Sequence, residues 1–380
     1  MANTLTSLIP DAYVALDVVS RELTGFIPSV ARDPKADRVA LNQTLRITSA
    51  PANADGNDVT PAMTIPSAVY ETIGNKSLTI SKSRYFPFSW TGEEQMSMDA
   101  GPGYLTIQQD QIAQAIRAAI NEMEADIAAA AYKGASRAYG TAASTPFAST
   151  LVDSANVRKI LDDNGAPLSD RHLTIDTVAG AALRTLTVLT KVNEAGNDSL
   201  LRQGTLLDLH GFAIRESAKI SAVVKGVGTG YVFNGTHAVG LTSLTMKNGS
   251  GALKAGDVVT FYGDTNKYVL AAAALTGATT VVIAAPGLLQ QHTDSEAMTV
   301  GGDFTPNVAH TRNSILLATR LPTLPKEGDM AIDRAEITDP RTGITLEIAA
   351  YPGYRMITYQ VLVAWGVSVI KPEHVAILLG

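Results

Sequence analysis

The chain has 380 residues and no cysteine, and it holds few aromatic and few charged side chains. Without cysteine there can be no disulfide, no thiolate zinc site and no cysteine nucleophile. No apolar run is long enough to cross a bilayer, and the first residues, MANTLTSLIPDAY, lack the basic region of a secretory signal. We therefore expect a protein with no membrane partner that folds in a cytoplasm.

What the chain does have is apolar surface and a negative net charge. Hydrophobic residues make up 46% of it, enough for more than one core, and its length suits two or three domains. Its 31 glycines, together with many Ala and Thr, indicate short strands and turns around some helix. The net charge of -6 argues against a sequence-specific nucleic-acid binder, which usually has a basic surface.

The spacings that signal a catalytic or metal site are also missing. The six histidines show no metal-binding spacing and are interpreted as lone surface or packing residues, and no nucleophile elbow or phosphate-binding loop is present. The glycine-rich run Gly226–Gly230 has the wrong spacing for a nucleotide site. Asp162–Gly165 fits a helix end better than a calcium loop. We expect no catalytic residues, no metal and no cofactor.

The first 100 residues predict an arm followed by an extended hairpin. Residues 1–44 contain an amphipathic run and then an extended stretch with too little apolar surface for a core, so they should lie on another surface. The apolar residues near the end of 45–100 share one parity, the period of a strand with one exposed face. They are Leu78, Ile80, Phe86, Phe88 and Trp90. Pro87 suits an edge strand, and the two-stranded hairpin expected here needs a partner surface.

A long helix is predicted from Thr106 to Tyr139, within residues 101–152. One apolar stripe recurs along it at steps of three and four residues, which we interpret as core packing. The stripe consists of Ile112, Ile116, Ile120, Met123, Ile127 and Ala131. Thr106 and Gln109 form a candidate capping box, and Gly140 ends the helix. Such a helix is a rod of about 50 Å.

In the rest of the chain, two segments with both helices and strands are predicted on either side of a segment with strands alone. Residues 153–221 read as alternating helices and strands, and residues 306–380 end in several strands. Between them, residues 222–305 show short strands between Gly, Asn and Asp turns at even spacing, which predicts an all-β module. The pattern indicates one α+β body with a β insertion, since loop tips tolerate inserted domains.

The stretch LKAGDVVTFYGDTNKYVL, residues 253–270, predicts a hairpin of this module. Its candidate core residues are Val259, Phe261, Tyr268 and Leu270. Asp264 and Lys267 flank the turn and would be free to face a neighbouring subunit. Three interpretations stay open: a cation or sugar site, a salt bridge between subunits, and a plain solvated turn.

Four segments resemble parts of tailed-phage major capsid proteins, and they follow one another along the chain in the order that the family has. YQVLVAWGVSVIKPEHVAILLG (359–380) resembles their final strand pair, and LLDLHGFAIRES (206–217) resembles their Gly-Phe strand. NVAHTRNSILLATRLP (307–322) is similar to the strand that follows their insertion. LKAGDVVTFYG (253–263) looks like a segment of the inserted domain in coat proteins of the short-tailed Salmonella phage type.

The resemblance implies the α+β capsid fold known as the Johnson fold. Its parts would be an N-terminal arm (1–44), an extended hairpin loop (45–100), a spine helix with the peripheral domain (101–152), an axial domain (153–221), an inserted β domain (222–305), and an axial and peripheral return with the final strands (306–380). It implies a structural subunit of pentamers and hexamers in an icosahedral phage head. The head would enclose double-stranded DNA without sequence-specific binding, with scaffolding protein and portal protein as partners. Assembly in the host bacterial cytoplasm and a final place in the virion capsid are implied.

In such a shell the hairpin loop would overlap the neighbouring subunit and the arm would reach the next capsomer. The residues expected at subunit interfaces are Asp11, Arg32, Lys82, Arg84, Trp90, Asp264 and Lys267. Two other functions stay open. One is an encapsulin-like compartment shell. The other is a β-rich carbohydrate-binding or hydrolytic tail protein, which would need clustered aromatic residues or paired carboxylates in 222–305, where the aromatic spacing instead suits a small core.

Overall fold

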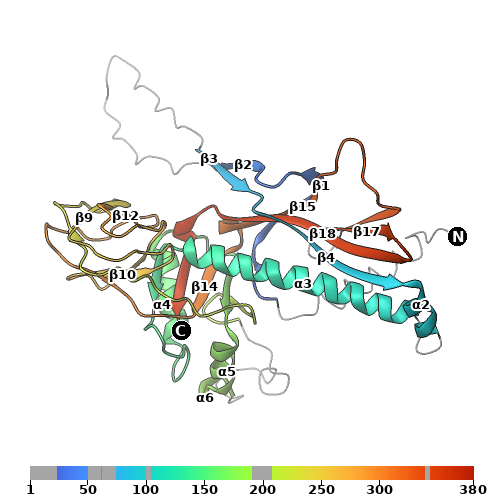
Figure 1. Ribbon diagram of the computed structural model, residues 1–380. Helices are drawn as coiled ribbons and strands as arrows, with labels where there is room; N and C mark the ends of the chain where they lie inside the picture. Colours follow the sequence, from blue (N-terminus) through green and yellow to red (C-terminus); the bar gives the residue numbers. More distant parts are fainter. Residues whose placement is uncertain (1–23, 50–60, 62–73, 100–103, 191–207, 339–342) are drawn as a thin grey trace.

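The computed structural model describes residues 24–49, 61, 74–99, 104–190, 208–338 and 343–380. They form a mixed α+β architecture in which one long helix, α3 (Tyr104–Lys133), runs along a six-stranded sheet (Figure 1). No helix in these ranges is long and apolar enough to span a membrane. The α+β class predicted from the sequence is confirmed.

The six-stranded sheet is built from both ends of the chain. Its strands are, in order, β1 (Ala31–Val39), β15 (Ile315–Pro322), β18 (Met356–Val369), β17 (Thr345–Gly353) and β16 (Asp333–Thr338), with β4 (Lys82–Thr91) on the other side of β18. β18 is long enough to pair with β17 and then β15 along one edge while β4 pairs along the opposite edge. Within the described chain β4 pairs with β18 alone, so Pro87 lies on an edge strand, as predicted.

α3 packs against this sheet with the predicted apolar stripe. The stripe residues Ile112, Ile116, Ile120, Met123, Ile127 and Ala131 are all buried. They share one core with Leu317, Val363 and Trp365 of the sheet, and burying each isoleucine or methionine side chain of the stripe contributes about 1.5–3 kcal/mol. The helix begins at Tyr104, so Thr106 lies inside it and the predicted capping box is wrong. Its 30 residues span about 45 Å.

The helix also ends earlier than predicted, at Lys133 instead of Tyr139. Residues Arg137–Tyr139 form strand β5, which lies between β11 (Lys267–Val269) and β19 (Val375–Leu379). The chain turns at Ser136, whose N–H and Oγ both donate to the carbonyl of Val375, at 2.9 and 2.8 Å. A helical period cannot reveal this ending, because the strand forms by pairing with residues far along the chain.

A second sheet, of eight strands, joins the middle of the chain to its C-terminus. Its order is β13 (Met298–Val300), β10 (Val258–Phe261), β11 (Lys267–Val269), β5, β19 (Val375–Leu379), β14 (Pro306–Thr311), β6 (Arg171–Ile175) and β7 (Ala213–Glu216). Helices α4 (Val152–Asp163) and α5 (Thr177–Thr185) share a core with β6, β14 and β19. Leu186 is extended, so the helical stretch that begins at Thr177 is divided into α5 and α6 (Thr187–Thr190).

Residues 222–305 contain strands and no helix, as predicted, and they have a core of their own. β8 (Val232–Phe233), β9 (Ser243–Lys247) and β12 (Thr280–Val282) form a three-stranded sheet. β10 and β11 form the predicted hairpin. Its four candidate core residues are buried together, and they are Val259, Phe261, Tyr268 and Leu270. β11 also pairs with β5, so this β module has a separate core but shares a sheet with the body.

β2 (Thr44–Ser49) and β3 (Gly74–Thr79) form a two-stranded sheet that projects from the body (Figure 1). The base of this sheet is fixed to the body by a small buried cluster, the root cluster, in which Leu78 and Ile80 pack on Ala364 of β18. The predicted two-stranded hairpin is confirmed at its base, while β4 belongs to the body and leads into α2 (Gly92–Asp99). Three short 3-10 helices complete the described elements: η2 (Ile27–Ser29), η3 (Arg312–Ser314) and η4 (Pro372–His374).

Candidate functional site

Two cations predicted at subunit interfaces lie on β4 and pair with acids of α3. Lys82 Nζ lies 2.9 Å from Glu122 and 2.9 Å from Asp126. The Asp126 carboxylate also accepts a hydrogen bond from Trp365 Nε1 at 2.9 Å. Arg84 Nε lies 3.2 Å from Glu122. This cluster ties β4 to α3 and β18 within one subunit.

The opposite charges of this cluster keep Lys82 and Glu122 ionised, as the shifts of their pKa values show. Burial lowers the pKa of Lys82, but hydrogen bonds and attraction from Glu122 and Asp126 outweigh it, and the net pKa is raised. Burial raises the pKa of Glu122, but Lys82 and Arg84 outweigh it, and the net pKa is lowered. The side chain of Arg84 is still 56% exposed, so a neighbouring subunit can reach it. Its predicted interface role stays a prediction.

Replacing Lys82 with alanine should lower the free energy of unfolding by about 1 kcal/mol, because the pairs are partly screened by solvent. The loss is measured by urea unfolding monitored by tryptophan fluorescence. Arg84→Ala is the matched control and should cost less, since it removes one longer pair from a more exposed position. An equal or larger loss for Arg84→Ala would contradict the assignment of Lys82 as the centre of the cluster.

Three other predicted interface residues have different positions. Trp90 is 6% exposed, lies in the main core and donates from Nε1 to Gln111 of α3 at 2.7 Å. Its ring therefore faces inward, which differs from the interface position expected for it. Arg32 lies in β1 opposite Leu317 and is partly exposed. Asp11 lies outside the described residues.

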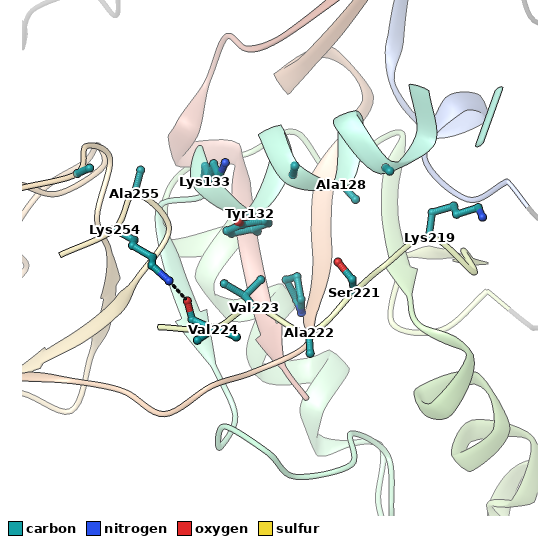
Figure 2. Close-up of a pocket in the computed structure, with 14 residues that line it drawn as sticks. Ala128, Tyr132, Lys133, Lys219, Ser221, Ala222, Val223, Val224, Lys254 and Ala255 are labelled. Carbon is teal, nitrogen blue, oxygen red and sulfur yellow. Dashed lines mark hydrogen bonds between the residues drawn. The ribbon is translucent and has the colours of Figure 1, made fainter. Parts of the chain in front are cut away.

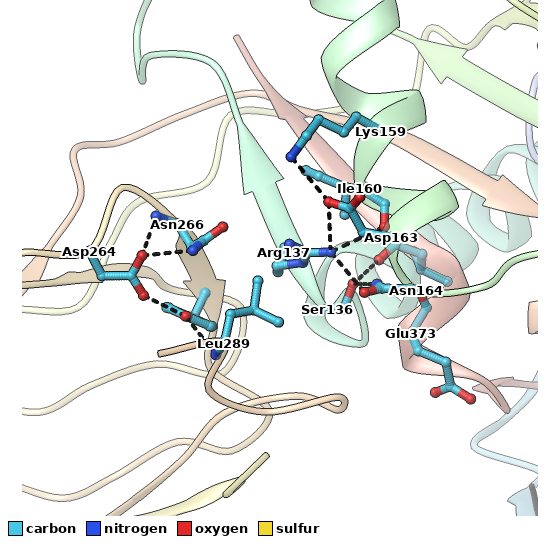
Figure 3. A network of polar contacts seen from close by, with 12 residues as sticks. Ser136, Arg137, Lys159, Ile160, Asp163, Asn164, Asp264, Asn266, Leu289 and Glu373 are labelled. Atoms are coloured by element: carbon cyan, nitrogen blue, oxygen red, sulfur yellow. Dashed lines mark hydrogen bonds and ion pairs between the residues drawn. The ribbon is translucent and has the colours of Figure 1, made fainter. Parts of the chain in front are cut away.

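Asp264 is turned into the β module, not toward solvent (Figure 3). One carboxylate oxygen accepts from the N–H and Nδ2 of Asn266, at 2.8 and 2.7 Å, and the other accepts from Tyr268 Oη at 2.6 Å. Lys267 Nζ donates to the carbonyl of Gly140, and burial lowers the pKa of Lys267. The sequence predicted that both side chains would be free to face a neighbouring subunit. Asp264 is instead buried, while Lys267 is partly exposed and keeps donors besides the one bound to Gly140. The carboxylate organises the turn from inside, so the turn is not simply solvated.

Arg137 of β5 connects the β module to the end of α4 (Figure 3). Its Nη2 donates to the carbonyl of Ile160 at 3.2 Å and to Asn164 Oδ1 at 2.8 Å. Asn164 Nδ2 in turn donates to the carbonyl of Glu373 at 2.7 Å. A cation at this end of α4 is favoured by the helix dipole. Asp162–Gly165 form the C-terminal turn of α4, as predicted.

The described N-terminal segment is fastened to α3 by one buried acid. Glu124 is fully buried and accepts hydrogen bonds from the N–H groups of Gly25, Phe26 and Ile27, at 2.6, 2.7 and 3.0 Å. Phe26 and Ile27 are themselves in the main core, and β1 then pairs in parallel with β15. The stretch expected to lie on another surface therefore lies, from Gly25 to Val39, on its own subunit.

Two histidines from neighbouring strands are buried behind this segment. The rings of His172 and His310 are 5.9 Å apart between centroids, and His310 Nε2 lies 3.2 Å from the carbonyl oxygen of Ser29. Burial, and then repulsion from His172, lowers the pKa of His310 to about 3. Burial also lowers the pKa of His172. Both were interpreted as lone residues, whereas the structure packs them against each other as neutral rings.

An exposed apolar surface that the sequence analysis missed lies beside α2. Tyr354 is 91% exposed and Met96 is 80% exposed. They line a groove of about 740 Å³ together with Glu93, Arg355 and Met356. Contiguous exposed apolar side chains often mark interaction sites. A signal was present in the sequence: Tyr354 lies in the turn between β17 and β18, where an aromatic side chain has no strand face to pack on.

A carbohydrate-binding tail protein would need clustered aromatic side chains on the surface of the β module, but most of these side chains lie in its core. Tyr231, Phe233, Phe261 and Tyr268 are buried together in its core, as their spacing predicted, while Tyr262 is exposed. In the described part of the chain, no group of three or more His, Asp or Glu side chains could hold a metal ion.

Comparison with known proteins identifies the fold. No protein-family model matches the chain, and no curated protein matches its sequence. The capsid structure of the cyanophage P-SCSP1u aligns over 94% of this chain and 88% of that chain, with a TM-score of 0.52 and 12% sequence identity. The chain has a phage capsid fold.

Two further solved structures align with lower scores. A structure from Mycobacterium phage Che8 covers 93% of this chain and 90% of its own, with a TM-score of 0.49 and 14% identity. The holo-SrpI encapsulin complex from Synechococcus elongatus PCC 7942 covers 93% and 86%, with a TM-score of 0.41 and 10% identity.

The phage capsid fold predicted from four sequence segments is confirmed. The division of the chain that the resemblance implied, and its assignment to the inserted-domain type, stay predictions. The separate core within residues 222–305 is compatible with both.

Proposed function

We propose that the chain is a structural subunit that assembles with copies of itself into a capsid shell. The observation that carries this proposal is the capsid fold, shared with the cyanophage structure over nearly the whole length of both chains. Because one fold can host several functions, the proposal also needs surfaces suited to assembly.

The β2–β3 sheet is such a surface. Its exposed residues include Thr44, Arg46, Lys76 and Ser77, and a projecting pair of strands is marginally stable without a partner. Within the described ranges each strand pairs only with the other, so both outer edges offer backbone groups to a partner. A neighbouring subunit that covers this sheet would pair those groups. The exposed groove beside α2 supplies a second contact region at another part of the body.

The finer features of the shell belong to the same proposal. We infer pentamers and hexamers in an icosahedral head around double-stranded DNA, with scaffolding and portal proteins as partners. Assembly would take place in a host bacterial cytoplasm and end in the virion. The net charge of -6 is compatible with a container that must not clamp nucleic acid.

Shortening the β2–β3 sheet tests the proposal while keeping every strand of the two larger sheets. Arg46 and Ser77 face each other across the pair, so residues 47–76 can be replaced by a two-residue Asn-Gly turn that suits a hairpin. The root cluster around Leu78 is kept. We expect the variant to fold but to form no closed shells, while the full chain forms shells visible by electron microscopy.

Shells of normal size from the shortened variant would show that this sheet is not needed for assembly, while leaving the shell function itself in place. A full chain that remains a monomer in light scattering, with and without scaffolding protein, would remove the shell function itself. Copurification of an enzyme cargo would instead favour an encapsulin-like compartment, and specific binding on a glycan array would favour a tail protein.

A further inference from the structure

A groove lies between α3 and the segment 219–224, bounded at one end by the turn at Lys254 and Ala255 (Figure 2). Its volume is about 550 Å³. Small apolar side chains form much of its lining, and they are Ala125, Ala128, Ala129, Ala222 and Val223. Tyr132 is the one aromatic residue in the lining. The small side chains leave room for a second chain to approach the backbone of α3.

Three exposed lysines border the groove. Lys133 and Lys254 lie near one end and Lys219 lies at the other, with the apolar lining between them (Figure 2). No acidic residue lines the groove. The ion pairs of the described residues involve none of the three lysines. Lys254 Nζ donates to the carbonyl of Val224 at 2.9 Å, which leaves two of its three donors available.

Asp257, the acid next to the Lys254 turn of the groove, is already bound by backbone N–H groups. Asp257 is buried, and its carboxylate accepts from the backbone N–H groups of Gly226 and Lys254, at 3.0 and 2.8 Å. Asp257 holds the turn that positions Lys254, and it forms no ion pair with any of the three lysines of the groove. In a chain with a net charge of -6, this groove is a local basic surface.

We propose that the groove binds an acidic peptide segment of a partner protein, with carboxylates at both ends and small apolar side chains between them. The lysines would pair with the carboxylates, and the alanine-rich lining would take the apolar side chains. A nucleic-acid backbone fits less well, because single strands are usually held by a continuous basic track and several stacking aromatic rings. The proposal goes beyond shell assembly and does not depend on it, since one unassembled chain carries the whole groove.

Binding is measured by fluorescence anisotropy on the full chain, at concentrations where light scattering detects no shells. The probe is a labelled peptide of about 14 residues that alternates Glu and Ala, and the matched peptide replaces every Glu with Gln. We expect the Glu peptide to bind and the Gln peptide not to bind. Lys133→Glu and Lys219→Glu should each weaken binding about fivefold or more, and added salt should weaken it further.

Lys326→Glu is the control variant, because Lys326 is exposed and lies outside the groove lining. It makes the same charge change and should leave binding unchanged. Should a Glu variant fail to fold by circular dichroism, Lys219→Gln replaces it, with a smaller loss expected.

Three outcomes overturn the proposal. Equal binding of the Gln peptide, or an effect of Lys326→Glu as large as that of Lys219→Glu, removes the groove as the site. Competition by a single-stranded DNA oligonucleotide of the same charge at equal strength reassigns it to nucleic acid. Salt-sensitive self-association that Lys219→Glu abolishes reassigns it to a second copy of this chain.

Discussion

Replacing Glu124 with alanine is expected to destabilise the chain by about 3–5 kcal/mol. The substitution leaves three buried N–H groups, those of Gly25, Phe26 and Ile27, without their acceptor, and a buried donor left unpaired costs about 1–3 kcal/mol. The stability change is measured by urea unfolding. Limited proteolysis should show faster cleavage within residues 24–39, since the same bonds fasten this segment to α3.

A graded pair of variants separates this role from a general effect of losing an acid. In Glu124→Gln one amide oxygen can still accept from Gly25 and Phe26, but the amide nitrogen would face the N–H of Ile27. Its loss should be about half that of Glu124→Ala. Glu93→Ala removes an exposed acid and should change stability by less than about 0.5 kcal/mol. Equal losses for Glu124→Ala and Glu93→Ala would show that the three bonds do not hold the segment.

Local sequence pattern was sufficient for the elements whose stability comes from a single periodic face. The α3 stripe, the strand parity of β4 and the hairpin at Val259 and Tyr268 were all predicted, and the structure has them. Their apolar spacing directly determines which face is buried. The same reasoning could not place the end of α3 at Lys133, because β5 exists only through its pairing with β11 and β19.

The candidate interface residues were harder to predict, because charge in a sequence does not reveal its partner. Lys82 and Asp264 look like exposed residues of a strand and a turn, yet each is held by partners within the same subunit. Glu124 had a usable signal, since it lies four residues after Ile120 and three before Ile127, on the buried stripe. An acid at such a position needs a buried partner. That partner is backbone about 100 residues earlier, which no local pattern indicates.

Acidification should loosen the same N-terminal segment through His310. This ring is fully buried, stacks on Phe26 and lies 3.2 Å from the carbonyl of Ser29. The charged groups around it are His172, Arg312 and Asp170, with Arg215 acting on His172. Apart from Asp170 they are cationic or become so in acid, and the protonated ring would be both buried and repelled.

The sign of the effect follows from the lowered pKa of His310, about 3 in the folded chain against 6.5 for the unfolded chain. Between these values the unfolded chain binds a proton that the folded chain does not, so stability is complete above about pH 6.5 and falls as the pH drops toward 3. Going from pH 7.5 to pH 4.5 should cost about 2–3 kcal/mol through this residue.

The contribution of His310 is isolated by comparing losses between these two pH values. In urea unfolding, His310→Gln should lose about 2–3 kcal/mol less than the parent chain, because glutamine can still donate to the Ser29 carbonyl but does not titrate. His374→Gln is the control: burial lowers the pKa of His374 too, but the side chain is only half-buried, so its effect should be smaller. If His310→Gln lost as much as the parent, the acid sensitivity would come from other groups. Because His310 contacts the residues that Glu124 binds, a confirmed difference would show that the attachment of the N-terminal segment depends on pH.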